Sequence, residues 1–501
     1  MNKPTLLSLL FLITFLMVNC GSDDSDPIDD KQEQEVTIDP NAFYVDKDHT
    51  EASDENDGRY VEDGGTGPWK TIQKMLNTLE AGQVGYVKEA STPYIPETIT
   101  SAFDAVAFFV KRSGTENNPI IIAGYPGERP RIGYNNREEA LQHDYHSGFA
   151  TDHNTSYVTI RNFEISYLTA SGVFMNPDVG LTNHNIVLEQ LYIHHLYGPD
   201  NTGGVRLDGC NNCVVRNSII HDIYSIKPGQ NPFSSEPYLL HSGIHGYQPS
   251  NCIIENNKIY NVARAIFQKQ AHEGHEKSHV VRNNIIFNAN NTALALEIQG
   301  AGAAAPRNAE FYNNLVYDCN SAVNVPLQDV GEQGDGLKIY NNTIINTRSI
   351  AYTEEMINVE VFNNILSGMR PSWSNNTNPS IVFSTAETVG KYPFVNGISY
   401  FDNNLYYNID ENWTLERHGT NRVDLNSLED WQNTTEPDFG LPNKPDQLSV
   451  INDPLFTDAP SRDYTLQSGS PALQGGRGGN YPTVLGAFRA DEQIGPDWDV
   501  Q

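Results

Sequence analysis

The chain has 501 residues, and its 63 acidic residues against 32 basic ones give a formal charge of −31. A charge of this size repels nucleic acid and anionic membrane surfaces at long range, so we exclude both as main partners. An acidic substrate is still compatible, because salt screens the global field within about 10 Å and a local basic groove acts at contact distance.

The first 40 residues contain an export signal and a polar tether. The stretch "MNKPTLLSLLFLITFLMVNC" has one lysine, an apolar run and then Cys20, which predicts a signal peptide over residues 1–19. With "GSDDSD" directly after Cys20, it resembles bacterial lipoproteins, particularly the surface lipoproteins of the Bacteroidetes. The resemblance implies acylation of Cys20, an acidic flexible tether over 20–40, and lipid anchoring at the cell outer membrane, surface-exposed or periplasmic. The alternative is an ordinary secreted protein with a cleaved leader.

Residues 41–501 read as one large domain, because the composition runs evenly after residue 40 without a second linker. Near its beginning, "WKTIQKMLNTLEAG" places Ile72, Met75, Leu76 and Leu79 at helical spacing and Gly82 after them. This pattern predicts an amphipathic helix within 69–82 that covers one end of the domain.

Short strands that end in an asparagine-rich turn recur from "VTIRNFEIS" to "SYFDNNLYY", at intervals of about 22 to 40 residues. The central pairs begin at Asn162, Glu189, Arg216, Asn256, Asn283, Asn313, Asn341, Asn363 and Asn403, with one position of slippage in the second and third. β-rich units at this period predict a solenoid, one turn per unit, with an inward aliphatic residue at alternate positions. We therefore expect an all-β, single-domain parallel β-helix whose asparagines are structural corner residues.

The cysteines give only a weak motif. "CNNC" at 210–213 lacks a second pair or a nearby histidine pair, so we predict no metal there. Aligning the repeats stacks Cys213 on Cys252, which favours an apolar column, with a disulfide as the alternative.

Two columns of outward side chains carry the chemistry. If Val173, Val205, Ile244, Ile266, Leu294 and Val323 point inward, alternation turns a first column outward: Phe174, Arg206, His245, Phe267, Ala295 and Asn324. One pleat along follows a second column: Asn176, Asp208, Tyr247, Lys269, Glu297 and Pro326. Neighbouring turns are about 4.8 Å apart, so these groups fit one sugar-binding cleft.

The spacing discriminates between reactions on a sugar. Asp208 and Glu297 are three turns apart, about 14 Å, whereas a glycosidase pair needs about 5 to 9.5 Å. Arg206, His245, Tyr247 and Lys269 lie on adjacent turns, which suits β-elimination on a uronic acid: one group neutralises the carboxylate, a base removes the C5 proton and an acid protonates the departing oxygen. We expect these four residues to be catalytic.

The same columns supply the expected substrate contacts. Asp208, Glu297, Phe267, Asn324 and the loop residue His272 are candidates for binding the sugar. Asp208 could instead pair with Arg206 or ligate Ca²⁺, which is the one cofactor that we consider. His194, His195 and His221 recur at the ends of corner strands, and we interpret them as structural.

Both ends of the domain resemble a known superfamily. "FYVDKDHTEASDENDG" and the following segment are similar to the amino-terminal cap of pectin-lyase-like polysaccharide enzymes, and "INDPLFTDAPSRDYTLQSGSPALQGG" is similar to their last turn. The resemblance implies a right-handed β-helix over about 41–490 but not the reaction, since lyases, glycosidases, epimerases and esterases share this scaffold.

Among these enzymes, the β-helix lyases of the chondroitinase B and alginate lyase type have a lysine base before an Asn-Asn corner. Lys269 with Asn283 and Asn284 can be placed on this element if "AHEGHEK" is an insertion. Their next-turn arginine is missing, because Glu297 stands there and Arg206 would have to substitute.

The sequence thus favours a monomeric polysaccharide lyase, or an oligosaccharide dehydratase, acting on an acidic polysaccharide or oligosaccharide. A β-helix glycoside hydrolase and a non-catalytic surface glycan-binding protein are the alternatives.

Overall fold

A computed structural model describes residues 38–499 except 101–104, 176–182, 199–201, 226–238, 270–278, 300–305, 326, 329–333, 355, 369–380, 387–396, 410–413, 419–422, 426, 435–442 and 489–493. The chain divides into the units Met1–Ile38 and Asp39–Gln501, and the elements below belong to the second. The predicted signal peptide, Cys20 and most of the tether lie outside the described residues.

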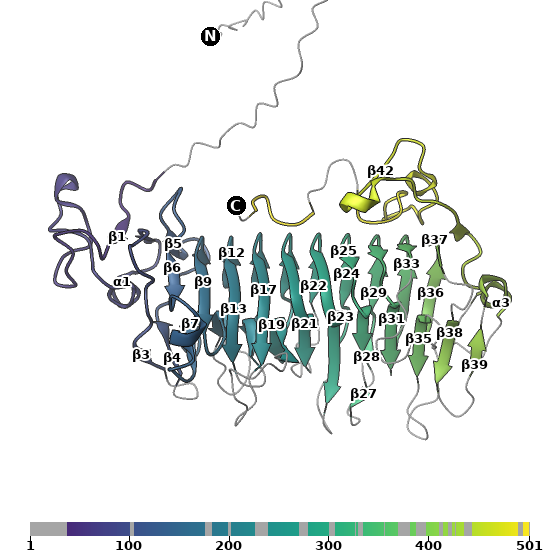
Figure 1. The fold of residues 1–501 in the computed structure, drawn as a ribbon, viewed down its shortest axis with the longest axis horizontal. Coiled ribbons are helices and arrows are strands. Elements are labelled where there is room, and N and C mark those ends of the chain that lie inside the picture. Colours follow the sequence, from purple (N-terminus) through teal and green to yellow (C-terminus); the bar gives the residue numbers. More distant parts are fainter. Residues whose placement is uncertain are drawn as a thin grey trace, which may run out of the picture. The chain divides into compact units, whose positions relative to one another are not determined.

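Successive turns of the chain stack side by side and form a right-handed parallel β-helix, which confirms the predicted all-β class (Figure 1). The strands line three faces, named A, B and C here. Face A is a 12-stranded parallel sheet. Its strands are β1 (Phe43–Val45), β2 (Val84–Val87), β5 (Ile120–Gly124), β8 (Val158–Arg161), β12 (Val187–Glu189), β16 (Val214–Arg216), β20 (Ile253–Glu255), β22 (Val280–Arg282), β24 (Glu310–Tyr312), β29 (Lys338–Tyr340), β33 (Val359–Phe362) and β36 (Ile398–Asp402).

Faces B and C are two parallel ladders that share two long strands, β21 (Lys258–Lys269) and β23 (Ile285–Gln299). Face B also contains β6 (Arg131–Gly133), β9 (Glu164–Leu168), β13 (Tyr192–Gly198), β17 (Ile219–Ser225), β25 (Leu315–Tyr317), β30 (Thr343–Ile345), β34 (Ile365–Ser367), β37 (Leu405–Tyr407) and β40 (Val450–Ile451). Face C also contains β4 (Val106–Val110), β7 (His146–Thr151), β10 (Val173–Met175), β14 (Gly203–Leu207), β19 (Ser242–Tyr247), β26 (Ser321–Val325), β31 (Ser349–Glu354), β35 (Ile381–Ala386) and β38 (Thr414–His418).

Shorter elements flank these faces. They are the strands β3 (Thr98–Ile99), β11 (Asn183–His184), β15 (Cys210–Asn211), β18 (Leu239–Leu240), β27 (Leu327–Gln328), β28 (Gly334–Asp335), β32 (Met356–Ile357), β39 (Val423–Leu425), β41 (Phe456–Asp458) and β42 (Asp463–Leu466), with the helices α1 (Ile72–Thr78), α2 (Arg137–Ala140) and α3 (Leu428–Asn433) and the 3₁₀ turns η1 (Val61–Asp63), η2 (Ala459–Ser461) and η3 (Pro471–Leu473). Among the described residues, none of the helices has the length and apolar character needed to cross a membrane.

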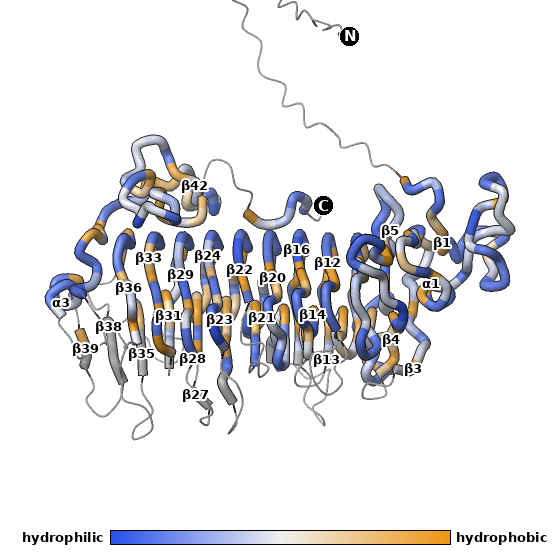
Figure 2. Tube along the Cα trace, turned by 180° about the vertical axis from the view of Figure 1, so that it is seen from behind, coloured by the Kyte–Doolittle hydropathy of each residue, from blue (hydrophilic) through white to orange (hydrophobic). Residues whose placement is uncertain are grey.

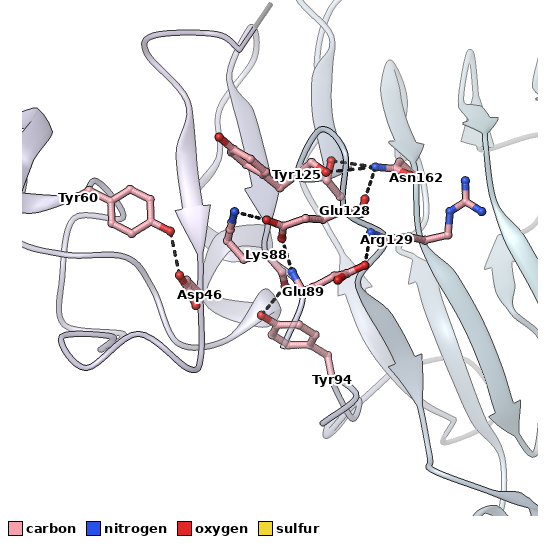
Figure 3. Close-up of polar contacts among 10 residues, drawn as sticks. Asp46, Tyr60, Lys88, Glu89, Tyr94, Tyr125, Glu128, Arg129 and Asn162 are labelled. Atoms are coloured by element: carbon pink, nitrogen blue, oxygen red, sulfur yellow. Dashed lines mark hydrogen bonds and ion pairs between the residues drawn. The ribbon is translucent and has the colours of Figure 1, made fainter. Parts of the chain in front are cut away.

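The predicted cap helix is α1, which is shorter than the range 69–82 from which it was inferred. The Thr71 side chain accepts a hydrogen bond from the Lys74 N–H and so starts the helix. Ile72, Met75 and Leu76 are buried against the first turns, so the helix covers the apolar interior there. Polar contacts attach the next segments, where the Glu128 carboxylate bonds Lys88 and the Asn162 amide donates to the Glu128 carbonyl (Figure 3).

A row of asparagines marks the corner between faces A and B, with hydrophilic residues along the corner and apolar residues within the strands (Figure 2). The first residue of each pair takes a left-handed conformation, for example Asn283 at φ 56°. In the two slipped repeats, Gln190 and Asn217 hold that conformation. The second asparagines form a buried ladder in which each backbone N–H donates to the side-chain oxygen of the next turn, as from Asn284 to Asn314 at 3.0 Å.

The cysteines of the "CNNC" stretch are buried thiols. Cys213 and Cys252 lie on neighbouring turns, because Val214 pairs with Ile253 in the strands that follow them. Both side chains belong to the apolar core, as the column interpretation predicted.

After its last turn the chain runs back along the outside of the coil (Figure 1). We call the described residues 453–488 and 494–499 the strap. The Gly486 N–H donates to the Asn363 carbonyl, the Gly495 N–H to the Asn283 carbonyl, and the Trp498 indole to the Asn217 carbonyl at 2.7 Å. The strap therefore links turns that are far apart in the solenoid.

Candidate active site

The two predicted outward columns lie on face C, where the strand register aligns them. Val173, Val205, Ile244, Ile266, Leu294 and Val323 pair from turn to turn and are buried in the core. The same register stacks Phe174, Arg206, His245, Phe267, Ala295 and Asn324, and it stacks Tyr247, Lys269 and Glu297 one pleat along. Asn176, Pro326 and His272 lie outside the described residues.

Asp208 holds Arg206 in place. The Arg206 Nε donates to the Asp208 carboxylate at 2.6 Å, and the Tyr247 backbone N–H donates to its other oxygen at 2.9 Å. Asp208 is only 2% exposed, and its burial raises the pKa to about 6 although Arg206 opposes the shift. In this structure Asp208 therefore pairs with Arg206 and orients it, which is one of the roles that the sequence left open beside contact to substrate or Ca²⁺.

His245 is the central group of the site. Its ring has no exposed surface, and neither ring nitrogen has a hydrogen-bond partner among the described residues. Its neighbours are rings: Phe267 at 4.8 Å, Tyr247 at 5.1 Å and His241 at 5.7 Å between centroids. Leaving a buried polar group unpaired costs about 1–3 kcal/mol, so this position calls for a functional explanation.

Burial lowers the pKa of His245 well below its usual value, and the nearby positive charges of His241, Arg206, Arg264 and Lys269 lower it further. The imidazole is therefore neutral at pH 7, with a free lone pair. Arg206 pairs with His245 in the strand register, and Arg264 and Lys269 lie over the rings of Phe267 and Tyr247 beside it.

The three basic side chains are stacked on aromatic rings. Arg206 lies 4.9 Å from the centroid of Phe174, Lys269 lies 5.0 Å from that of Tyr247, and Arg264 lies 4.1 Å from that of Phe267. Phe267 is buried beneath this contact, so in this structure it supports a cation and offers no open platform for a sugar.

Lys269 and Glu297 are neighbours in register, yet their side chains do not form an ion pair. Glu297 is paired with Arg264 at 3.7 Å, and no described carboxylate lies within ion-pair distance of Lys269. Lys269 is thus the basic group of the site without an anionic partner among the described residues. Asn324 stacks on Ala295 at the edge of the cluster.

Arg264 is a site residue that the sequence interpretation missed. Strict alternation from Ile266 turns Arg264 inward, but β21 passes the corner between faces B and C there and its register shifts between Val262 and Arg264. The shift frees the arginine to reach Glu297. A charged residue at a predicted core position was the available signal of a bulge.

Comparisons with known proteins agree with the fold. A family model described as a right handed beta helix region matches residues 147–329, which is less than half of the chain. No curated protein matches the sequence.

Solved structures with a similar fold have low sequence identity. A structure described as XylC in complex with xylose has a TM-score of 0.46 and 13% identity, covering 82% of this chain and 86% of its own. The pectate lyase Pel9A has a TM-score of 0.43 and 11% identity, covering 89% and 96%. A GH136 lacto-N-biosidase from Eubacterium ramulus has a TM-score of 0.42 and 15% identity, covering 76% and 67%. These likenesses concern the fold alone.

Proposed function

We propose that this protein catalyses β-elimination on uronic-acid-containing polysaccharides or oligosaccharides. The reaction would make it a polysaccharide lyase, or a dehydratase if the departing group is water at a chain end. The observation that carries the proposal is the neutral, unpartnered imidazole of His245 among the side chains of Arg206, Arg264 and Lys269.

Elimination requires that the uronate carboxylate be neutralised, because only then is the C5 proton acidic enough to remove. Arg206 and Lys269 flank Tyr247 and are placed to bind the two carboxylate oxygens, while Asp208 keeps Arg206 in position. The basic groups are concentrated here although the whole chain carries a charge of −31. This local excess of positive charge favours an anionic sugar over a neutral one.

His245 and Tyr247 complete the proton transfers. His245 accepts the C5 proton, the electron pair of the C5–H bond forms the C4=C5 double bond, and the C4–O bond breaks. Burial raises the pKa of Tyr247, so the phenol is protonated and can donate to the departing oxygen. His245 then returns its proton to Tyr247, whose ring lies 5.1 Å away, and both groups are restored.

The substrate also adjusts the base. In the free protein burial, and after it the nearby cations, lower the pKa of His245, which weakens it as a proton acceptor. A bound carboxylate neutralises part of that positive charge and so raises the basicity of the imidazole. Because the ring has no exposed surface, the sugar must displace the groups that cover it before the proton can transfer.

Hydrolysis by a carboxylate pair is less well supported. Asp208 and Glu297 are each paired with an arginine and lie three strand steps apart, from β14 through β19 and β21 to β23. This corresponds to about 14 Å, beyond the range of a glycosidase pair.

A screen of the signal-less protein against alginate, ulvan, pectin and glycosaminoglycans tests the proposal. Elimination produces a C4=C5 double bond conjugated to the carboxylate, which is followed by its ultraviolet absorbance. We expect this absorbance to rise on at least one uronate glycan. New reducing ends without it would indicate hydrolysis, and binding without either product would indicate a glycan-binding protein; both would refute the proposal.

A further inference from the structure

A second polar cluster lies on the outer corner between faces B and C, away from the columns of face C. It contains His195 from β13 and His221 and Asp222 from β17, on neighbouring turns. One ligand atom from each of these residues lies within 4.8 Å of the others. Two imidazoles and a carboxylate are donors that divalent transition metals such as Zn²⁺ prefer.

The residues that form this corner elsewhere in the coil make the cluster unusual. The left-handed corner positions of later turns are Asn261, Asn288, Asp318, Asn346 and Asn408, whereas the turns here have His195 and Asp222. Asparagine serves the turn geometry by itself, as the bond from Asn288 to Asn261 illustrates at 2.8 Å. The turn therefore does not require a histidine beside an aspartate.

His194 lies against one side of the cluster. Its Nδ1 and the His195 Nδ1 are 2.7 Å apart, so one of them carries a hydrogen and donates it to the other. With that hydrogen on the His195 Nδ1, the Nε2 of His195 has a lone pair, as a metal ligand needs. The contact between the two histidines is therefore compatible with metal binding by His195.

On the other side, outer groups orient His221 and Asp222. The His221 Nδ1 and an Asp222 oxygen share one proton at 2.6 Å, and the His221 Nε2 lies 3.2 Å from the Tyr192 hydroxyl. The Asn261 amide donates to the other Asp222 oxygen at 3.1 Å. Metal-binding histidines and carboxylates are held by such outer partners.

We propose that His195, His221 and Asp222 bind a divalent transition-metal ion that joins two successive turns of the coil. The ion replaces the proton shared by His221 and Asp222, which is released, while Tyr192 accepts from the His221 Nε2–H. Zn²⁺ with ligand distances of about 2.0–2.2 Å needs ligand atoms about 3.3 Å apart. The three ligand atoms now lie within 4.8 Å of one another, so small side-chain movements bring them to that separation. Three protein ligands leave one tetrahedral position to water.

The test is a Zn²⁺ titration of the full folded protein by calorimetry, after chelator treatment and removal of any affinity tag. We expect one Zn²⁺ ion per chain and an upward shift of Tm with Zn²⁺. The double variant His195→Asn/Asp222→Asn gives both corners the residue found on later turns, so it should fold. It should weaken binding by at least about a hundredfold, and Tyr192→Phe by about tenfold.

His49→Ala, in the segment before the first complete turn, is the matched control and should bind as the wild type does. Absence of Zn²⁺ binding to the wild type would overturn the proposal. Equal affinity of the folded double variant would overturn it as well, because the ion would then bind elsewhere. Neither result depends on the elimination activity, so this proposal and the proposed function stand or fall separately.

Discussion

Lys269→Ala removes one of the basic groups around His245 and gives the sharpest test of the site. Lys269 lies over the Tyr247 ring and has no anionic partner among the described residues. Its loss therefore costs at most the cation–π contact, about 0.5–1 kcal/mol of stability. We expect the variant to fold with a Tm close to that of the wild type.

The expected loss of activity is much larger. A group that stabilises the developing charge or moves a proton in the transition state contributes about 10² to 10⁴ in rate. At about 1.36 kcal/mol per tenfold this corresponds to about 2.7–5.4 kcal/mol of activation free energy. Initial rates of double-bond formation on the best uronate glycan, with kcat and KM measured separately, give this quantity directly.

Lys258→Ala is the matched control because Lys258 begins the same strand, β21, on face B. Its ammonium pairs with the exposed Asp499 at 3.1 Å, a contact worth under about 1 kcal/mol. We expect this variant to keep activity within about twofold of the wild type. Activity of Lys269→Ala within about threefold of the wild type would refute the assignment and leave neutralisation of the carboxylate to Arg206.

Three further predictions concern the ladder, a buried carboxyl group and the anchor. Asn314→Ala breaks four buried hydrogen bonds and should lower the free energy of unfolding in urea by about 4 kcal/mol. Asn291→Ala, at an exposed position, should change it by about 0.5 kcal/mol or less. Similar losses for the two variants would contradict a stabilising role of the ladder. The folded pKa of Asp208, about 6, exceeds its unfolded value of about 3.9, so the stability that this group contributes is greatest below about pH 4 and falls as pH rises from about 4 to 6. Relative to Asp208→Asn, the wild type should lose about 3 kcal/mol over that window, and parallel pH profiles would count against the shift. We also propose that Cys20 is acylated, so that fatty-acid labelling in the bacterial host should mark the wild type but not Cys20→Ser; an unlabelled wild type would argue for simple secretion.

The sequence repeat predicts most of this fold because each turn uses the same inward and corner positions. An inward aliphatic residue and a left-handed asparagine recur often enough that the register of face C follows from the sequence, and the positions of Arg206, Tyr247 and Lys269 follow from the register. The slipped repeats were also recoverable, since Gln190 and Asn217 take the corner conformation.

What the sequence could not predict depends on contacts between side chains. Alternation identifies an outward position for His245 but not its complete burial, which depends on the groups that cover it. It also fails wherever a strand passes a corner, which hid Arg264. The cluster of His195, His221 and Asp222 joins residues 27 positions apart whose meeting depends on corner geometry. Single-residue interpretations therefore called these histidines structural.

The strap has a consequence for how such a coil can change its length. Solenoids gain or lose whole turns readily, because each turn contacts only its neighbours. Here the Trp498 indole bonds the Asn217 carbonyl, 281 residues earlier, and the strap bonds Asn363 and Asn283 on the way. One added turn would lengthen the path by about 4.8 Å and shift every strap contact beyond it by one turn. The length of the strap therefore constrains the number of turns between its contacts, and a turn inserted there requires a longer strap.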